Sequence, residues 1–248
     1  MTLSDHELER YARHIVLPQV GGVGQRKLKA ASVAVIGAGG IGSAVIPALA
    51  GAGVGRLTII DDDVVELVNL HRQPLFRERD AGYSKADLAL QFVQRLNRFV
   101  KAVPVQERIG PDNAGRLLAD HDLVIDGSDN FATRLAVGDA CVQLGIPLLS
   151  AAAVQFQGQV ALFRSKPCYR CFVGDAFDSD ECDNCAELGV LGALTATAGS
   201  FAALLAIEFI AGIGGDQAGR VHLFDGEKLS WRAIDIPPDP ACRTCGSA

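Results

Sequence analysis

The stretch Ser32-Val-Ala-Val-Ile-Gly37-Ala-Gly39-Gly40-Ile-Gly42 decides the fold. A short apolar run rich in β-branched residues predicts a strand buried on both faces, as parallel sheets require. The glycines after it predict a tight turn into a helix, where backbone N–H groups and the helix N-terminus can bind a phosphate. A second apolar run, residues 56–61, ends at Asp61, 24 positions after Gly37, about where a carboxylate meets a ribose hydroxyl. These features predict an adenine-nucleotide site but do not separate ATP from NAD or FAD. Tight packing of the turn without a ligand is the structural alternative.

Strands and helices alternate after this turn. The sequence predicts helices over residues 40–52, 84–99, 112–119 and 132–144, and strands over 102–106, 123–126 and 147–150. The alternation predicts an α/β, Rossmann-like fold whose mostly parallel sheet has helices on both faces. After residue 150 we expect strands over 159–164, 220–224 and 229–234 as an antiparallel C-terminal extension, and a buried helix over 194–211. One domain is expected over residues 1–248, with an N-terminal helical segment 1–31, a nucleotide-binding core 32–150 and a C-terminal region 151–248.

Local signals add detail to this outline. Ser4 and Glu7 have capping-box spacing, so a helix should begin at about residue 5, and Ser84 is expected to cap the helix over 84–99. The glycines at 21, 22 and 24 are expected to form a loop. Pro47 lies inside a predicted helix and is expected to kink it or make one turn irregular. Residues 62–84 are polar and predict a long functional loop.

The composition excludes several classes of protein. The 248 residues carry 23 Lys and Arg against 29 Asp and Glu, a net charge of −6, and 49% are apolar. These values are ordinary for a globular chain, and the acidic balance argues against a nucleic-acid partner. The uncharged residues 188–207 are long enough to cross a membrane, but their small side chains and acidic flanks favour a buried helix instead. The polar N-terminus lacks a secretory signal, so we expect a cytoplasmic protein with reduced cysteines.

Six of the seven cysteines form three CxxC pairs, at positions 168 and 171, 182 and 185, and 242 and 245. Two such pairs make a closed tetrahedral Zn²⁺ site. Cys168 and Cys171 can combine with the middle pair as a compact local site, or with the last pair, which would fasten the C-terminal tail to the body. Spacing alone slightly favours the local pairing, and a disulfide or redox role for one pair stays open. Cys141 is predicted to be a small core residue.

Charged side chains gather in two further places. Asn69, Arg72 and Lys85 lie just beyond the second strand, where two cations and an amide can neutralise the β- and γ-phosphates of a nucleotide; a solvated basic face is the alternative. The segment Asp126-Gly-Ser-Asp129-Asn130 follows an apolar strand, at the end of the sheet where ligands bind. Asp129 is a candidate Mg²⁺ ligand, and Asn130 or Ser128 can cap the next helix.

A series of ordered motifs then resembles one family. They are Arg10-Tyr-Ala-Arg13-His-Ile-Val-Leu-Pro18, Gly37-Ala-Gly-Gly-Ile-Gly42, Asp61-Asp-Asp63, Asn69-Leu-His-Arg72-Gln73, Lys85, Ser128-Asp-Asn130, Pro167-Cys-Tyr-Arg-Cys171 and Cys185-Ala-Glu-Leu-Gly-Val-Leu-Gly192. Across nearly the whole chain the sequence resembles the ThiF/MoeB (HesA/MoeB/ThiF) family of sulfur-carrier-protein adenylyltransferases, which are related to ubiquitin-activating enzymes.

The resemblance implies an activity. Members of the family use ATP and Mg²⁺ to adenylylate the C-terminal glycine of a ubiquitin-like sulfur carrier that ends in diglycine, in molybdopterin or thiamine biosynthesis. The carrier carboxylate attacks the α-phosphate and pyrophosphate leaves. The resemblance also implies a homodimer, and it assigns carrier binding and zinc to residues 151–248.

The resemblance implies site residues as well. The nucleotide would be bound by Gly37, Gly39, Gly40, Gly42, Asp61 at the ribose, Asp63, Asn69, Arg72, Lys85, Asp129 and Asn130, with Asp129 on Mg²⁺. Arg72, Lys85 and Asp129 would act in catalysis together with Arg13, which would reach the phosphates of the other subunit. Zn²⁺ would bind Cys168, Cys171, Cys242 and Cys245, and Cys185 would be a candidate for sulfur transfer.

Three features depart from the family pattern: Cys182 makes Cys185 part of a pair, Pro47 lies deep in its helix, and Val68 replaces a polar residue of some relatives. Two other functions remain possible on the residues alone. One is a nicotinamide or flavin oxidoreductase that uses the same glycine turn. The other is a non-catalytic, zinc-containing scaffold for a ubiquitin-like partner.

Overall fold

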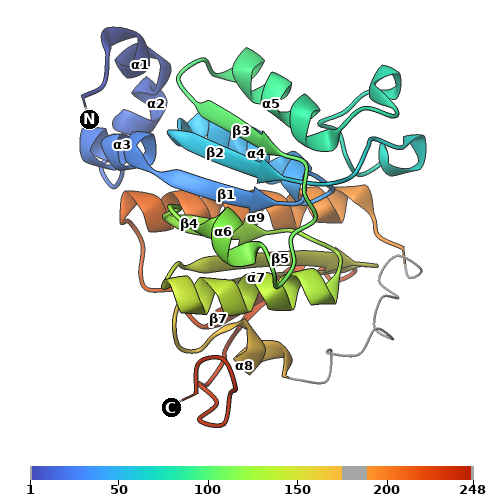
Figure 1. Ribbon diagram of the computed structural model, residues 1–248. Helices are drawn as coiled ribbons and strands as arrows, with labels where there is room; N and C mark the ends of the chain where they lie inside the picture. Colours follow the sequence, from blue (N-terminus) through green and yellow to red (C-terminus); the bar gives the residue numbers. More distant parts are fainter. Residues whose placement is uncertain (1, 175–188, 247–248) are drawn as a thin grey trace.

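A single twisted sheet organises the chain in the computed structural model, which describes residues 2–174 and 189–246 (Figure 1). Its strand order is β3-β2-β1-β4-β5-β6-β7-β8. The parallel part consists of β1 (Ser32–Ile36), β2 (Arg56–Ile60), β3 (Lys101–Val105), β4 (Leu123–Asp126) and β5 (Leu148–Val154). The antiparallel part consists of β6 (Gln157–Phe163), β7 (Arg220–Asp225) and β8 (Ser230–Asp235). The predicted fold class is confirmed, with the order 3-2-1-4-5 of a dinucleotide-binding sheet.

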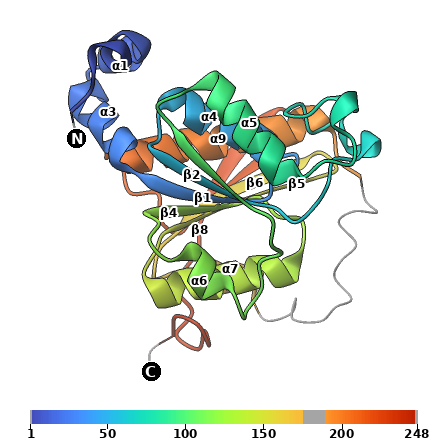
Figure 2. The same ribbon diagram turned by 45° about the horizontal axis from the view of Figure 1, so that its top comes forward.

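Helices cover both faces of the sheet (Figure 2). One face carries α4 (Gly42–Ala52), α5 (Lys85–Leu96) and α9 (Gly192–Ala211), and the other carries α6 (Ala114–Leu118) and α7 (Phe131–Leu144). Alternate residues of β1 supply the two cores: Val33 and Val35 pack with α4, α5 and α9, whereas Ala34 and Ile36 pack with α6 and α7. The apolar run in β1 is therefore continuous because both faces of the strand are buried.

The hydrogen bonds confirm two predicted helix caps. Ser4 and Glu7 form a full capping box at the start of α1 (Asp5–Arg10). Ser84 Oγ accepts from the backbone N–H of Asp87 at 3.3 Å at the start of α5. α5 ends at Leu96, before the predicted residue 99, because the side chain of Asn97 leaves the helix to donate to Tyr11 Oη at 2.8 Å and Ala50 O at 2.7 Å.

The expected loop at residues 21–24 is wrong. Gly21, Gly22 and Gly24 lie in a helix, α3 (Gly21–Ala30). Gly24 is buried, and a Cβ built on it would lie 3.4 Å from Cβ of Ala211, so α3 packs closely against the end of α9. Tertiary packing therefore overrides the weak helix propensity of glycine. Pro47 does not end α4, which continues through it from Gly42 to Ala52.

α9 is by length and composition apolar enough to span a membrane, and it is the one such helix among the described residues. In this fold α9 contacts α3, α4, β5 and β6. Its small residues allow this close packing: a Cβ added at Gly199 would lie 2.6 Å from the backbone oxygen of Ile41. The expected buried helix is therefore confirmed as part of the core, and it begins at Gly192, slightly earlier than expected.

We expect Gly199→Ala to destabilise the protein by about 1–3 kcal/mol, because the new methyl group must push α9 away from the start of α4. The matched control is Gly51→Ala, on the exposed side of α4, where an added Cβ meets no atom within 4 Å. That substitution should be neutral or stabilising by up to about 1 kcal/mol, since alanine has the higher helix propensity. Urea unfolding measures both changes. Equal stability of Gly199→Ala and wild type would contradict the packing argument.

Candidate active site and metal centre

At least two positions of the turn after β1 require glycine because a side chain would collide with neighbouring backbone. Gly37 has a left-handed backbone (φ 85°), and a Cβ there would lie 3.3 Å from the oxygen of Gly127. A Cβ on Gly42 would lie 2.1 Å from the oxygen of Gly37. Gly39 and Gly40 face Gln73 and Thr195, at 3.5 Å and 3.0 Å from the built Cβ atoms. The turn is thus enclosed by the loop after β4, by residue 73 and by the start of α9.

Asp61, directly after β2, joins the turn to the next loop. Its Oδ2 accepts from the backbone N–H of Ala38 at 2.7 Å, and its Oδ1 accepts from that of Asp63 at 2.9 Å. Burial raises the pKa of Asp61, while the bond from Ala38 and the charge of Lys85 act in the opposite direction. A carboxylate oxygen has lone pairs beyond one hydrogen bond, so the Asp61 carboxylate can still accept from a sugar hydroxyl.

The predicted cations lie on the loop of residues 62–84 and at its end. Lys85 is only 4% exposed, and its Nζ donates to Oδ2 of the exposed Asp63 at 2.8 Å. Arg72 Nη2 donates to Asn69 Oδ1 at 2.7 Å. The backbone of residues 71–72 lies against the start of α9, since a Cβ on Gly192 would lie 2.3 Å from the oxygen of His71. The loop is thereby folded back toward the glycine turn.

The loop after β4 is the third element beside the turn. Asp126 is buried, and its Oδ1 accepts from the backbone N–H of Ser128 at 2.9 Å. Asn130 caps α7 by accepting from the N–H of Thr133 at 2.9 Å, so of the two expected capping residues Asn130 takes the role. Asp129 lies between them and is exposed. The structure therefore gathers Asp61, the 62–84 loop and Asp129 at the carboxyl ends of β1, β2 and β4.

The sequence analysis did not identify Arg134, whose side chain holds the loop after β4 by hydrogen bonds. The Arg134 side chain is buried on α7; its Nη1 donates to Ser150 Oγ at 3.0 Å, and its Nη2 donates to Ala151 O at 2.7 Å and to Ser128 O. Burial alone would lower the pKa of Arg134, but the charge of Asp126 raises it, so the guanidinium stays charged. The sequence signal that could have identified Arg134 is a cation four positions after the helix cap Asn130.

Arg13 is not brought to this site within one chain. It lies on α2 (Ala12–Ile15) and is exposed. α2 and the other N-terminal helices lie beyond the opposite end of the sheet from the loops that follow β1 and β2 (Figures 1 and 2). A role for Arg13 at the phosphates therefore requires a second copy of the chain.

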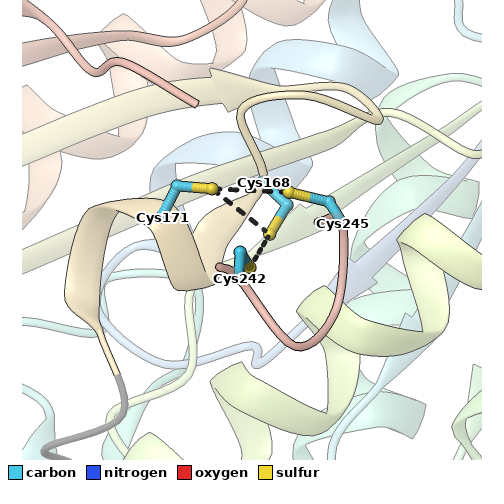
Figure 3. Close-up of side chains that lie close together, drawn as sticks. All are labelled: Cys168, Cys171, Cys242 and Cys245. Atoms are coloured by element: carbon cyan, nitrogen blue, oxygen red, sulfur yellow. Dashed lines mark hydrogen bonds between the residues drawn. The ribbon is translucent and has the colours of Figure 1, made fainter. Parts of the chain in front are cut away.

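Four cysteines converge at a separate place (Figure 3). The Sγ atoms of Cys168, Cys171, Cys242 and Cys245 all lie within 4.8 Å of one another. Individual Sγ–Sγ distances are 3.6 Å for Cys168 and Cys242 and 3.4 Å for Cys171 and Cys245. Four thiolates about 2.3 Å from a tetrahedral Zn²⁺ would be about 3.8 Å apart, so the cluster fits such an ion.

The cluster decides between the two pairings. It combines Cys168 and Cys171 with the last pair, as the resemblance implied, and not with the middle pair, which spacing slightly favoured. Cys182 and Cys185 lie outside the described residues. Burial works against ionisation of Cys242, but hydrogen bonds from the backbone N–H groups of Cys245 and Thr244 lower its pKa to about 7, which favours the thiolate that binds metals.

Cys141 behaves as predicted for a core residue. It is 2% exposed and packs among the apolar side chains of α6 and α7. Burial raises the pKa of its thiol to about 12. The Cys141 thiol therefore stays protonated and takes no part in the four-cysteine cluster.

Together, the parallel sheet, the glycine turn and the charged groups beside it are typical of a nucleotide-binding α/β protein, and the four-thiol centre is separate from them. The chain belongs to the ThiF family, whose model matches residues 11–244. The matched range covers nearly the whole sequence.

Several relatives are similar over the whole chain. The sulfur carrier protein adenylyltransferase of Thermus thermophilus is 43% identical, and the match covers 99% of this chain and 93% of that protein. The SAMP-activating enzyme E1 of Haloferax volcanii is 39% identical, with 99% and 92% covered. The adenylyltransferase and sulfurtransferase MOCS3 of Culex quinquefasciatus is 43% identical, but this chain spans only 56% of its length.

Solved structures agree on the fold. E. coli MccB in complex with MccA-N7isoASN superposes with a TM-score of 0.85 at 22% identity, over 99% of this chain and 76% of that chain. E. coli MccB with ATP gives a TM-score of 0.83 at 24% identity, over 96% of this chain and 75% of that chain. At this identity the comparison establishes the architecture of the sheet and its helices.

Replacing Cys242 and Cys245 together by serine should abolish tight Zn²⁺ binding, because two of four thiolates are lost and a hydroxyl is a poor zinc ligand. Metal analysis of the purified protein should find about one zinc per wild-type chain and much less in the variant. Cys141→Ala is the matched control, since this thiol is buried elsewhere, and it should retain the metal. Full zinc content in the double variant would show that the cluster is not the site.

Proposed function

We propose that this ThiF-family adenylyltransferase uses ATP and Mg²⁺ to activate the C-terminal glycine of a small ubiquitin-like sulfur carrier that ends in diglycine. The products would be the carrier acyl-adenylate and pyrophosphate. The observation that carries the proposal is the buried Lys85, held beside Asp61 and the glycine turn by Asp63. The relative of similar length from Thermus thermophilus is named a sulfur carrier protein adenylyltransferase, and the one from Haloferax volcanii is named a SAMP-activating enzyme E1.

The geometry supports a reaction driven by positioning and charge neutralisation. The backbone N–H groups of Gly39, Gly40 and Gly42 would face the phosphates. The N–H of Gly37 donates to Ile60 O at 2.9 Å, so Gly37 would shape the turn around the nucleotide, and Asp61 would hold the ribose. Arg72 and Lys85 would neutralise the charge that develops on the leaving pyrophosphate, with Asn69 and Asp63 orienting them. The attacking group is already a carboxylate, so no general base is required.

The loop after β4 would complete the nucleotide site. Asp129 is exposed beside the turn, and we assign it to Mg²⁺, which when bound screens the charge of the phosphates. Asn130 fixes the loop by capping α7 and would help to place Asp129. Oxygen ligands of this kind suit a hard divalent cation.

The family does not favour the other two functions. An oxidoreductase that uses the same turn binds no triphosphate, so it would not need the cations Lys85 and Arg72 there. A non-catalytic scaffold would not need to bind a nucleotide.

We assign residues 32–150 to the nucleotide and residues 151–248 to the carrier and Zn²⁺, within one domain over residues 1–248 that has a helical segment 1–31. We further assign the protein to the cytoplasm and to molybdopterin or thiamine biosynthesis. Cys185, with Cys182, stays a candidate for sulfur transfer.

Lys85→Ala should lower kcat/KM in ATP–pyrophosphate exchange, measured with a diglycine-ended carrier, by about 10²- to 10³-fold, the cost typical of losing one preorganised charge donor. The partner left behind, Asp63, is exposed, so the fold should survive. Lys101→Ala, at the exposed start of β3, is the matched control and should keep wild-type activity. Full activity of Lys85→Ala would refute the assigned role. Absence of exchange in the wild type with every diglycine carrier would refute the function.

We propose a homodimer in which Arg13 of one protomer reaches the nucleotide of its partner, because α2 lies too far from the site of its own chain. Arg13→Ala and Lys85→Ala should each be impaired alone. An equal mixture that exchanges subunits should recover about a quarter of wild-type exchange activity, since half of the dimers then contain one intact site. No recovery in mixtures shown to contain hybrid dimers would mean that Arg13 does not act across subunits.

A further inference from the structure

Asp139 on α7 connects the two halves of the four-cysteine cluster. Its Oδ1 accepts from Arg170 Nε and its Oδ2 accepts from Arg170 Nη2, each at 2.8 Å. The same Oδ1 accepts from Thr244 Oγ1 at 2.7 Å. Arg170 is an inner residue of the first CxxC pair, and Thr244 is an inner residue of the last one. One carboxylate, outside the cluster itself, therefore joins two turns that are more than seventy residues apart in sequence.

Asp139 and Arg170 form a bidentate salt bridge, whose geometry is fixed. The Arg170 side chain is 7% exposed and that of Asp139 is 28% exposed. Two parallel N–H···O bonds fix the plane of the guanidinium against the plane of the carboxylate, which a single bond would not do. A buried guanidinium also needs its partner strongly, because an unpaired charge at that depth is costly.

α7 also contacts the cysteine region at Gly138 and Val142. A Cβ built on Gly138 would lie 3.1 Å from Cβ of Tyr169, so the glycine allows α8 (Tyr169–Val173) to approach α7 closely. Val142, one turn further along, packs against the cysteines. α7 is thus the surface on which the cysteine turns rest, and Asp139 is its polar contact with both.

We propose that Asp139 is a positioning residue that docks the C-terminal segment, residues 236–246, and holds the four thiols in register before a metal ion binds. This inference rests on the proposed zinc site, but it concerns the chain's own contacts. The segment is then held by two independent sets of contacts, the metal–thiolate bonds and the hydrogen bonds of Asp139. Either one alone keeps the segment docked, and loss of both releases it.

The first experiment measures the rate at which Zn²⁺ passes from the protein to a chromogenic chelator. Asp139→Ala should release zinc about 10- to 100-fold faster than wild type, as is typical when a residue that orients metal ligands is lost. Thr244→Val, which removes only the bond from the tail, should show a smaller increase, and Asp139→Asn should be intermediate because its amide oxygen still accepts. Thr197→Val, at a half-buried position of α9 outside the cysteine region, is the matched control and should behave as wild type. Equal release rates in all five proteins would overturn the proposal.

The second experiment uses reduced, metal-free protein and trypsin, which cleaves after Arg243 inside the last CxxC pair. Mass spectrometry should show slow cleavage there in wild type and in Thr197→Val, and fast cleavage in Asp139→Ala. Equally fast cleavage in wild type and Asp139→Ala would overturn the proposal, even if the wild type held no metal at all. A cooperative thermal transition confirms that each variant is folded. ATP–pyrophosphate exchange by the wild type tests the proposed function separately.

Discussion

The candidate active site depends on how closely the glycine turn after β1 approaches its neighbours. A side chain at Gly42 would collide with the backbone oxygen of Gly37, and one at Gly37 would press on Gly127 of the neighbouring loop. Because the three loops are in contact at this edge, the Asp61 carboxylate can reach back to Ala38 while its other oxygen holds Asp63. Asp63 in turn fixes Lys85. The steric constraint in the backbone thereby sets the positions of the charges.

These charges are placed in an otherwise acidic chain. Lys85 is buried, and its Nζ pairs with the exposed carboxylate of Asp63. Arg134 is buried among backbone oxygens next to Asp126. Groups that are held this way need little reorganisation when a charged ligand arrives, and their fields are screened less than those of surface residues. The two cations are therefore held in place at an edge of the sheet that also carries Asp61, Asp63 and Asp129.

The sequence predicted what depends on local pattern. Doubly buried strands leave continuous apolar runs, and the caps at Ser4, Ser84 and Asn130 follow from neighbouring residues, so sheet, helices and most loops were predictable. What depends on distant partners was not. α3 forms in spite of its glycines because it packs on Ala211. The compact cysteine pairing was favoured because spacing ignores the path of the tail, and Arg134 and Asp139 resemble ordinary helix residues until their partners are seen.

α7 links the two sites that these residues form. It begins at Asn130, beside the candidate nucleotide loop, and Asp139 lies nine residues further on, about 13 Å along the helix axis. The four thiols could supply all four ligands of a tetrahedral ion and would leave no position for a substrate, which is the arrangement of a structural metal and not of a catalytic one. Such a metal contributes by anchoring the chain. Since Asp139 attaches the last cysteine turn to α7, and Arg134 of the same helix holds Ser128, the cysteine centre supports the helix that follows the candidate nucleotide loop.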